Sequence, residues 1–214
     1  MPINFIAVLD HEHLENTVFL TAFAKSLAKL GDRKGIVIHG DSPYTDRLIQ
    51  TGMMREDARL RAIKDLNKRL VGLFADQGIP TIGIHGFQKG LLTKQGDDIL
   101  LNKKAFDAHH DTPNLLISSL VEQNGAPLHV PLPEFSRSIS AELDDADILL
   151  FSKNEKDEIL ISESKEKLSW SSLPAGFAET TLPDEFRNFD HPVKLTTATD
   201  FANWPSLNKV TKIE

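Results

Sequence analysis

The chain has 214 residues, of which 40% are hydrophobic, so it is long enough to bury one core or two small ones. Its formal charge of -7 argues against a nucleic-acid or anionic-membrane partner, because both need a basic face that no Lys/Arg cluster supplies. It contains no cysteine, which excludes disulfides and thiolate metal sites and is typical of a reducing compartment. No apolar run approaches the roughly 20 residues that span a bilayer, and the N-terminus lacks the pattern of a signal peptide. We therefore expect a cytoplasmic protein with no nucleic-acid and no membrane partner.

The first half of the chain predicts strands that alternate with helices. An apolar run at 5–9 predicts a buried strand, and apolar residues at helical spacing from Leu14 to Leu30 predict a helix that ends at Gly31. Strands follow at 36–38 and 81–84, separated by an amphipathic helix over 56–77. This order predicts an α/β fold with right-handed crossovers and a mainly parallel sheet.

The middle of the chain predicts a hairpin and a short helix. Residues 91–94 and 99–102 flank a turn-rich segment and suit a β-hairpin. Asp111-Thr112-Pro113 followed by Leu115, Leu116 and Leu120 predicts a helix that ends at Asn124-Gly125, and a strand is expected over 128–132.

The last third is less regular. Residues 146–151 predict another buried strand, paired in a hairpin with 159–161, and 193–197 and 210–213 are predicted to pair as closing strands.

Polar residues gather directly after the predicted strands, where ligands bind in doubly wound sheets. They are Asp10-His11-Glu12-His13, His39-Gly40-Asp41-Ser42, His85-Gly86 and Ser152-Lys153. One interpretation is a metal site built from His11, His13, His39 and His85; the other is that these are hydrogen-bonded loop histidines, and the absence of a His-Glu-x-x-His helix favours the latter. The Gly40-Asp41-Ser42 turn could cradle an anion or could simply start a helix.

Several segments occur in the order found in one family of enzymes. Ile36-Val37-Ile38-His39-Gly40 resembles a strand and glycine-rich turn that holds substrate, and Gly52-Met53-Met54-Arg55 resembles a segment whose arginine binds the substrate carboxylate. Asn67-Lys68-Arg69-Leu70 and the strand ending in Ser152 are similar to later segments of the same family. The chain thus resembles the amino acid kinases, most closely the acetylglutamate kinases.

This resemblance implies a three-layer αβα arrangement around a mainly parallel sheet, the carbamate-kinase-like fold. It implies a substrate-binding half over 1–145 and a shortened nucleotide-binding half over 146–214. It also implies the site residues. Substrate would contact His39, Gly40, Asp41, Ser42 and Arg55, and a nucleotide cofactor would contact Ser152 and Lys153.

The sequence departs from the family where phosphate should bind. Val8-Leu9-Asp10-His11 replaces the family's Lys-Leu-Gly-Gly, and Asp41-Ser42 replaces a Gly-Gly pair. The helix whose lysine contacts the ATP phosphates has no counterpart between Ser162 and His191. Phosphoryl transfer depends on positioning and charge neutralisation, and each lost stabilising group costs roughly 10²–10³ in rate.

Three functions remain open at this stage, and no catalytic residue is assigned. The leading one is a protein without normal kinase activity that binds a small molecule or forms homo-oligomers for interaction. The second is an active kinase for the carboxylate of an acylated amino acid, which would use ATP and Mg²⁺ and would need Lys153 or Lys194 in place of the missing lysines. The third is a metal-dependent hydrolase that uses the four histidines.

Overall fold

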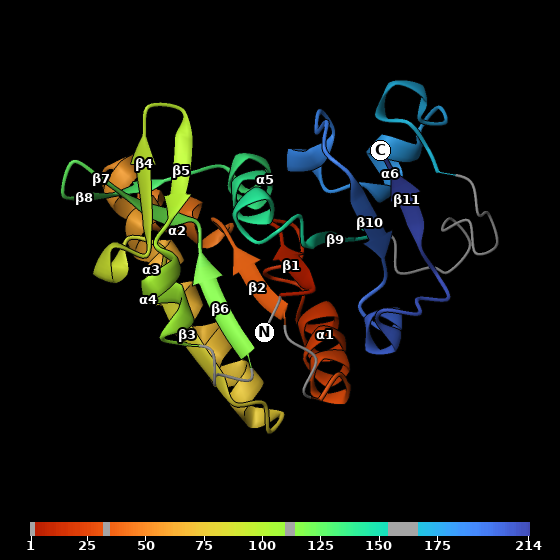
Figure 1. Cartoon of the computed structure of the whole chain (residues 1–214). Helices are drawn as coiled ribbons and strands as arrows, with labels where there is room; N and C mark the ends of the chain where they lie inside the picture. Colours follow the sequence, from red (N-terminus) through yellow and green to blue (C-terminus); the bar gives the residue numbers. More distant parts are fainter. Residues whose placement is uncertain (1–2, 32–34, 110–113, 154–166) are drawn as a thin grey trace.

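The computed structural model describes residues 3–31, 35–109, 114–153 and 167–214. In these ranges the largest element is a seven-stranded sheet, parallel throughout except for an antiparallel strand at one edge (Figure 1). No helix in the same ranges is long and apolar enough to cross a membrane. The strands follow one another across the sheet in the order β11 (Thr211–Ile213), β10 (Val193–Thr196), β9 (Asp147–Phe151), β1 (Phe5–Leu9), β2 (Gly35–His39), β6 (Asn114–Ser118) and β3 (Thr81–His85).

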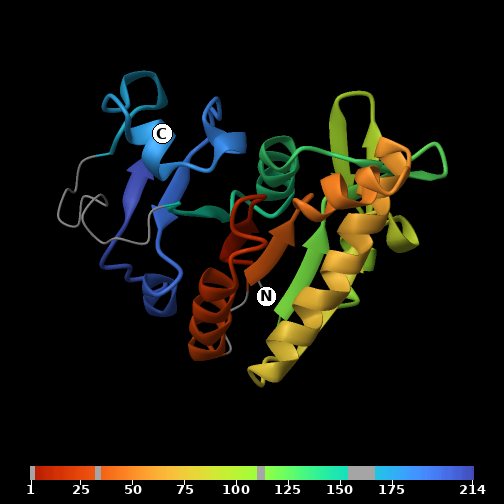
Figure 2. The ribbon, with the colours of Figure 1, turned by 180° about the vertical axis from the view of Figure 1, so that it is seen from behind.

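Two apolar layers cover the two faces of this sheet, because successive residues of a strand point in opposite directions. Phe5 and Leu9 of β1 pack with helices α1 (Thr17–Lys29) and α3 (Arg55–Asp76), which cross one face side by side (Figure 2). Ile6 and Val8 point to the other face, which is covered by helix α5 (Leu132–Glu142) and a second, smaller sheet. The predicted α/β class with a mainly parallel sheet is confirmed.

The second sheet contains the hairpin that the sequence predicts around residues 95–98. Strands β4 (Leu92–Gln95) and β5 (Asp98–Leu101) pair antiparallel, and β4 also pairs with β7 (Leu120–Gln123), which is followed by β8 (Ala126–His129). The remaining helical segments are short. They are α2 (Tyr44–Gln50), α4 (Lys103–Asp107), α6 (Phe177–Thr181), η1 (Gln88–Gly90), η2 (Trp170–Ser172), η3 (Asp184–Phe186) and η4 (Asp200–Asn203).

The helix predicted from Leu115, Leu116 and Leu120 is wrong. Leu115 and Leu116 belong to β6 and Leu120 to β7, while 111–113 lie outside the described residues. Leu115 packs in one layer and Leu116 in the other, so a run of consecutive apolar residues here marks a strand buried on both faces. Asn124-Gly125, predicted to end that helix, forms the tight turn of the β7–β8 hairpin, with both residues at positive φ.

The strand predicted over 128–132 is only partly right. Strand β8 ends at His129, and α5, which the sequence analysis does not predict, begins at Leu132. The helix buries Leu132, Phe135 and Ile139 together with two serines, and the polar serines weaken the apolar pattern that would have revealed it.

The closing part of the sheet agrees with prediction where the structure describes it. Strand β9 lies within the predicted 146–151 strand, and β10 pairs antiparallel with β11, as predicted for 193–197 and 210–213. The parallel pairing of β9 with β10 was not predicted. The predicted strand at 159–161 falls outside the described residues. The division into halves at 145/146 stays a prediction.

Candidate functional site

A cavity of about 410 Å³ lies at the carboxyl edge of the sheet, beside the ends of β1 and β2. This is where parallel sheets of the doubly wound kind place their ligands. Five segments that are far apart in the sequence meet around it. The lining residues are Asp10, His11, Glu12, Asp41, Arg59, His129, Pro131, Pro183, Asp184 and Glu185.

The turn after β1 is built around a buried ion pair. One oxygen of Asp10 accepts hydrogen bonds from the backbone N–H groups of Glu12 and His13, and the other lies 2.6 Å from His13 Nδ1. Nε2 of His13 lies 3.1 Å from the backbone carbonyl of Ser152, at the end of β9. Asp10 and His13 are only 1% and 4% exposed. The pair therefore ties the end of β1 to the end of β9.

His13 carries a positive charge in this arrangement. Both ring nitrogens face acceptors, which requires both to hold a proton. Burial opposes the charged form, but the hydrogen bond to Asp10, its negative charge and the Ser152 carbonyl outweigh that cost and raise the pKa of His13 above 6.5. The cation is directed at Asp10 and Ser152, and His13 does not line the cavity.

The polar groups of the turn after β2 form hydrogen bonds within the turn and with the start of α2. The carboxylate of Asp41 accepts from the Ser42 backbone N–H at 2.7 Å and from the Thr45 hydroxyl. Ser42 is buried, and its hydroxyl accepts from the Tyr44 backbone N–H at 3.4 Å. These contacts fix the start of α2. Asp41 and Ser42, which were predicted to contact a substrate, are therefore already hydrogen-bonded within the protein.

Gly40 has a packing role in the same turn. A Cβ at this position would come within 2.9 Å of the Leu132 side chain at the start of α5. The glycine thus allows α5 to pack closely against the end of β2.

Arg59 is the arginine of this cavity. Its Nε lies 3.2 Å from Asp41 and its Nη1 lies 3.2 Å from Glu56. Arg55, predicted to bind substrate, begins α3, is exposed and does not line the cavity, so its role stays a prediction. Arg59 was not identified from the sequence. It lies one helical turn after Arg55, on the same face of the helix, and could have been considered on that ground.

A third group of charged residues lies where the C-terminal part of the chain reaches the cavity. Lys153 lies 2.6 Å from Asp184 and 3.7 Å from Glu12. Burial, followed by repulsion from Asp10, raises the pKa of Glu12. Glu185 is exposed as a residue, yet desolvation at its carboxyl group and repulsion from Asp10 raise its pKa as well. The pKa of Asp184, by contrast, is lowered, chiefly by its hydrogen bond with Lys153.

The four strand-end histidines do not converge. His39 is fully buried; its Nδ1 donates to the Gly40 carbonyl at 3.1 Å and its Nε2 accepts from Asn67 at 3.0 Å. Burial lowers the pKa of His39 to about 4, which matches this neutral ring. His85 lies at the end of β3 and contacts Ser118. Among the described residues no three metal-ligating side chains form a group that could hold an ion, so the hydrolase hypothesis finds no support.

The predicted nucleotide contacts, Ser152 and Lys153, lie beside the cavity rather than on its lining. Ser152 is buried, and its backbone carbonyl and N–H contact His13 and the Thr196 carbonyl. Lys153 is held by the two carboxylates described above. A role for either residue toward a nucleotide stays a prediction.

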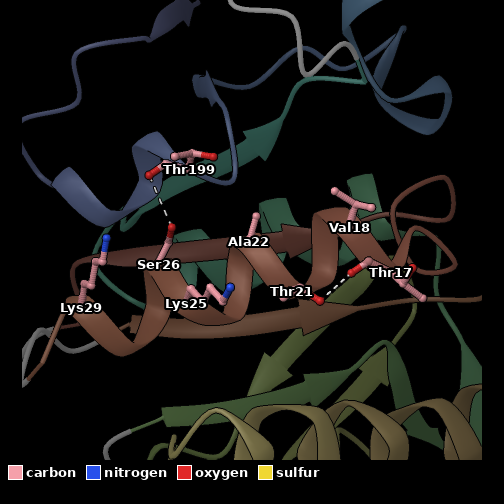
Figure 3. A pocket seen from close by; sticks show the side chains of 8 residues that line it. All are labelled: Thr17, Val18, Thr21, Ala22, Lys25, Ser26, Lys29 and Thr199. Carbon is pink, nitrogen blue, oxygen red and sulfur yellow. Dashed lines mark hydrogen bonds between the residues drawn. The ribbon is translucent and has the colours of Figure 1, made fainter.

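A second hollow of about 550 Å³ runs along the outer side of α1 (Figure 3). It is lined by Lys25, Lys29 and small side chains, and Ser26 donates to the Thr199 carbonyl across it at 3.4 Å. Only one of its residues, Thr199, comes from outside α1, and none lies at a strand end. The carboxyl-edge cavity is therefore the better candidate site.

No protein-family model and no curated protein sequence matches the chain. Solved structures do. N-acetylglutamate synthase from Neisseria gonorrhoeae has a TM-score of 0.66 at 14% identity, over 99% of this chain and 59% of that one. Aspartate kinase from Synechocystis has a TM-score of 0.67 at 12% identity, over 98% and 40% of the two chains. The T. acidophilum isopentenyl phosphate kinase has a TM-score of 0.59 at 10% identity, over 99% and 100%.

The chain has an amino-acid-kinase-like fold. At these identities the likeness concerns the fold alone, and the chain spans about three fifths of the synthase and two fifths of the aspartate kinase. The amino-acid-kinase-like fold was predicted from the strand and turn segments, and that prediction is confirmed.

Proposed function

We propose that this chain is an amino-acid-kinase-fold protein that binds a small molecule in its carboxyl-edge cavity and does not transfer phosphoryl groups from ATP. The observation that carries the proposal is the charge of the cavity lining. A volume of about 410 Å³ suits a small ligand. The kinase activities of proteins with a similar fold are properties of those proteins. The lining of this cavity differs in charge from a phosphate-binding site.

Carboxylates outnumber cations on the lining. Arg59 is the only lysine or arginine among the residues named as lining it, and two carboxylates already engage this guanidinium. A nucleoside triphosphate carries several negative charges, and phosphoryl transfer needs cations to neutralise the charge that develops. The cavity favours neutral or positively charged ligands. The five carboxylates are Asp10, Glu12, Asp41, Asp184 and Glu185.

The end of β1 supports the same conclusion. The resemblance implies a lysine here that faces the transferring phosphoryl group. In its place stands Val8, which is fully buried, and the Gly-Gly that follows in the family is replaced by Asp10 and His11. The Asp10 carboxylate is occupied by hydrogen bonds from two backbone N–H groups and by its ion pair with His13. The nearby cation of His13 is buried and points to β9. The turn therefore supplies no lysine or arginine to the cavity.

The active-kinase alternative would need lysines from elsewhere, and their positions do not favour it. Lys153 is shared by Glu12 and Asp184. Lys194 pairs at 2.7 Å with Asp147, the first residue of β9, and so lies toward the amino end of the parallel strands, away from the cavity. We therefore keep this alternative second.

Thermal unfolding with and without millimolar Mg²⁺-ATP tests the proposal. A ligand at 100 times its Kd adds about 2.7 kcal/mol to the free energy of unfolding, which visibly raises the midpoint. We expect no rise. A rise that disappears in Arg59→Gln and persists in the matched variant Arg61→Gln would show ATP in the cavity and overturn the proposal. Arg61 is a suitable control because it lies on the same helix, is exposed, and also pairs with a carboxylate, Asp65.

A further inference from the structure

The carboxyl end of β3 holds a cluster of donors that the cavity does not include. Strand β3 is an edge of the large sheet, and the register places His85 beside Ser118 of β6, which in turn lies beside His39 of β2. The side of β3 that carries His85 faces α3, because a Cβ added at Gly83, two residues earlier, would meet Asn67 of that helix. His85 is thus a half-buried imidazole between the sheet edge and α3.

The contacts of His85 leave one ring nitrogen for a ligand. Nδ1 lies 2.9 Å from the hydroxyl of the buried Ser118, and the ring stacks on Phe87 with centroids 5.8 Å apart. Within the described residues Nε2 has no hydrogen-bond partner. When the Ser118 hydroxyl donates to Nδ1, the neutral ring carries its proton on Nε2 and can donate to an acceptor.

Two lysines of α3 stand beside this imidazole. Lys64 and Lys68 are four residues apart and so share one face of the helix. The ammonium group of Lys64 lies 5.2 Å from the centre of the Phe87 ring that stacks on His85. Neither lysine forms an ion pair among the described residues, although Arg59 and Arg61 of the same helix do.

The pKa of His85 reflects burial and the positive charge of these two lysines. Burial lowers its pKa, Lys64 and Lys68 lower it further, and no carboxylate acts in the opposite sense, so the pKa falls to about 4. In a chain with a net charge of -7, this is a local excess of positive charge. A bound anion would relieve it.

We propose that Lys64, Lys68 and Nε2 of His85 form a binding site for a small oxyanion, phosphate or carboxylate, at the carboxyl end of β3. Two ammonium groups and one ring N–H would bind the oxyanion oxygens, and charge-assisted hydrogen bonds of this kind are the strong ones. The site is separate from the carboxyl-edge cavity, which shares none of these residues. It does not depend on the function proposed for that cavity.

Titration of the protein with inorganic phosphate, followed through the His85 ring signals by NMR at constant ionic strength, tests this site. We expect a saturable shift of those signals and a higher His85 pKa in the bound state, because an anion stabilises the imidazolium form. The double variant Lys64→Gln/Lys68→Gln should weaken binding at least about tenfold. Acetate in a second titration separates the two oxyanions, and binding of either one supports the proposal.

The matched control is Lys25→Gln/Lys29→Gln. These lysines are also four residues apart on a helix, are exposed, and change the net charge equally. It should bind phosphate as the unmodified protein does. A linear, unsaturated response of His85, or equal weakening in both double variants, would mean a general effect of surface charge and would overturn the site.

Discussion

Replacing Asp10 with alanine is expected to lower the free energy of unfolding by about 3–5 kcal/mol, the range found when one partner of a buried ion pair is removed. Asp10 is 1% exposed and accepts three hydrogen bonds, one of them from the ring of His13. Its loss leaves two backbone N–H groups and a buried imidazolium without their acceptor. Denaturant unfolding of Asp10→Ala measures the effect, with Asp97→Ala in the exposed β4–β5 turn as the control.

The effect of Asp10→Ala should depend on pH through His13. The folded-state pKa of His13 is raised above 6.5, so the pair contributes its full stability below pH 6.5 and loses it as the pH rises through the folded-state pKa. The difference between the unmodified protein and Asp10→Ala should therefore be larger at pH 6 than at pH 9. A loss below about 1 kcal/mol at pH 6, the scale of an exposed pair, would contradict the assignment of a buried charged pair.

Phe23→Ala should be comparably destabilising, by about 3–5 kcal/mol, because a large buried ring leaves a cavity when it is truncated. Phe23 is fully buried in the layer beneath α1. Its ring stacks on Phe201 with centroids 5.3 Å apart and meets Phe151 edge to face at 5.3 Å. It thereby joins α1 to β9 and to the C-terminal segment.

The matched control for Phe23 is Val18→Ala on the same helix. Val18 is 68% exposed, and its truncation should change the free energy of unfolding by no more than about 0.5 kcal/mol. If Phe23→Ala were as mild as this control, the aromatic layer would not hold α1 to the sheet in the way the packing indicates.

Local patterns predict the fold well where each residue's environment follows from its neighbours in sequence. The run at β1 and the helical spacing in α1 and α3 are such cases, because burial repeats with the period of the element. Helix α5 and strand β6 could not be predicted from local patterns. Buried serines obscure the helix, and the consecutive leucines of β6 fit a helix until its neighbours are known to cover both faces.

The candidate site was predictable only in part. The polar turns after β1 and β2 were found, since parallel strands bring their carboxyl ends to one edge. Asp184 and Glu185 could not be found, because they come from a weakly patterned segment and reach the cavity through the tertiary fold. The sequence also gave no sign that Asp10 pairs with His13 or that Asp41 pairs with Arg59, and these pairings decide the charge of the site.

The most direct test of the central claim is ATP turnover by the purified protein with Mg²⁺, measured as phosphoryl transfer to a panel of acylated amino acids, free amino acids and phosphate monoesters. We predict no transfer above the protein-free rate with any acceptor. Transfer that is lost in Arg59→Gln and kept in Arg61→Gln would contradict the account and establish the cavity as the active site of a kinase.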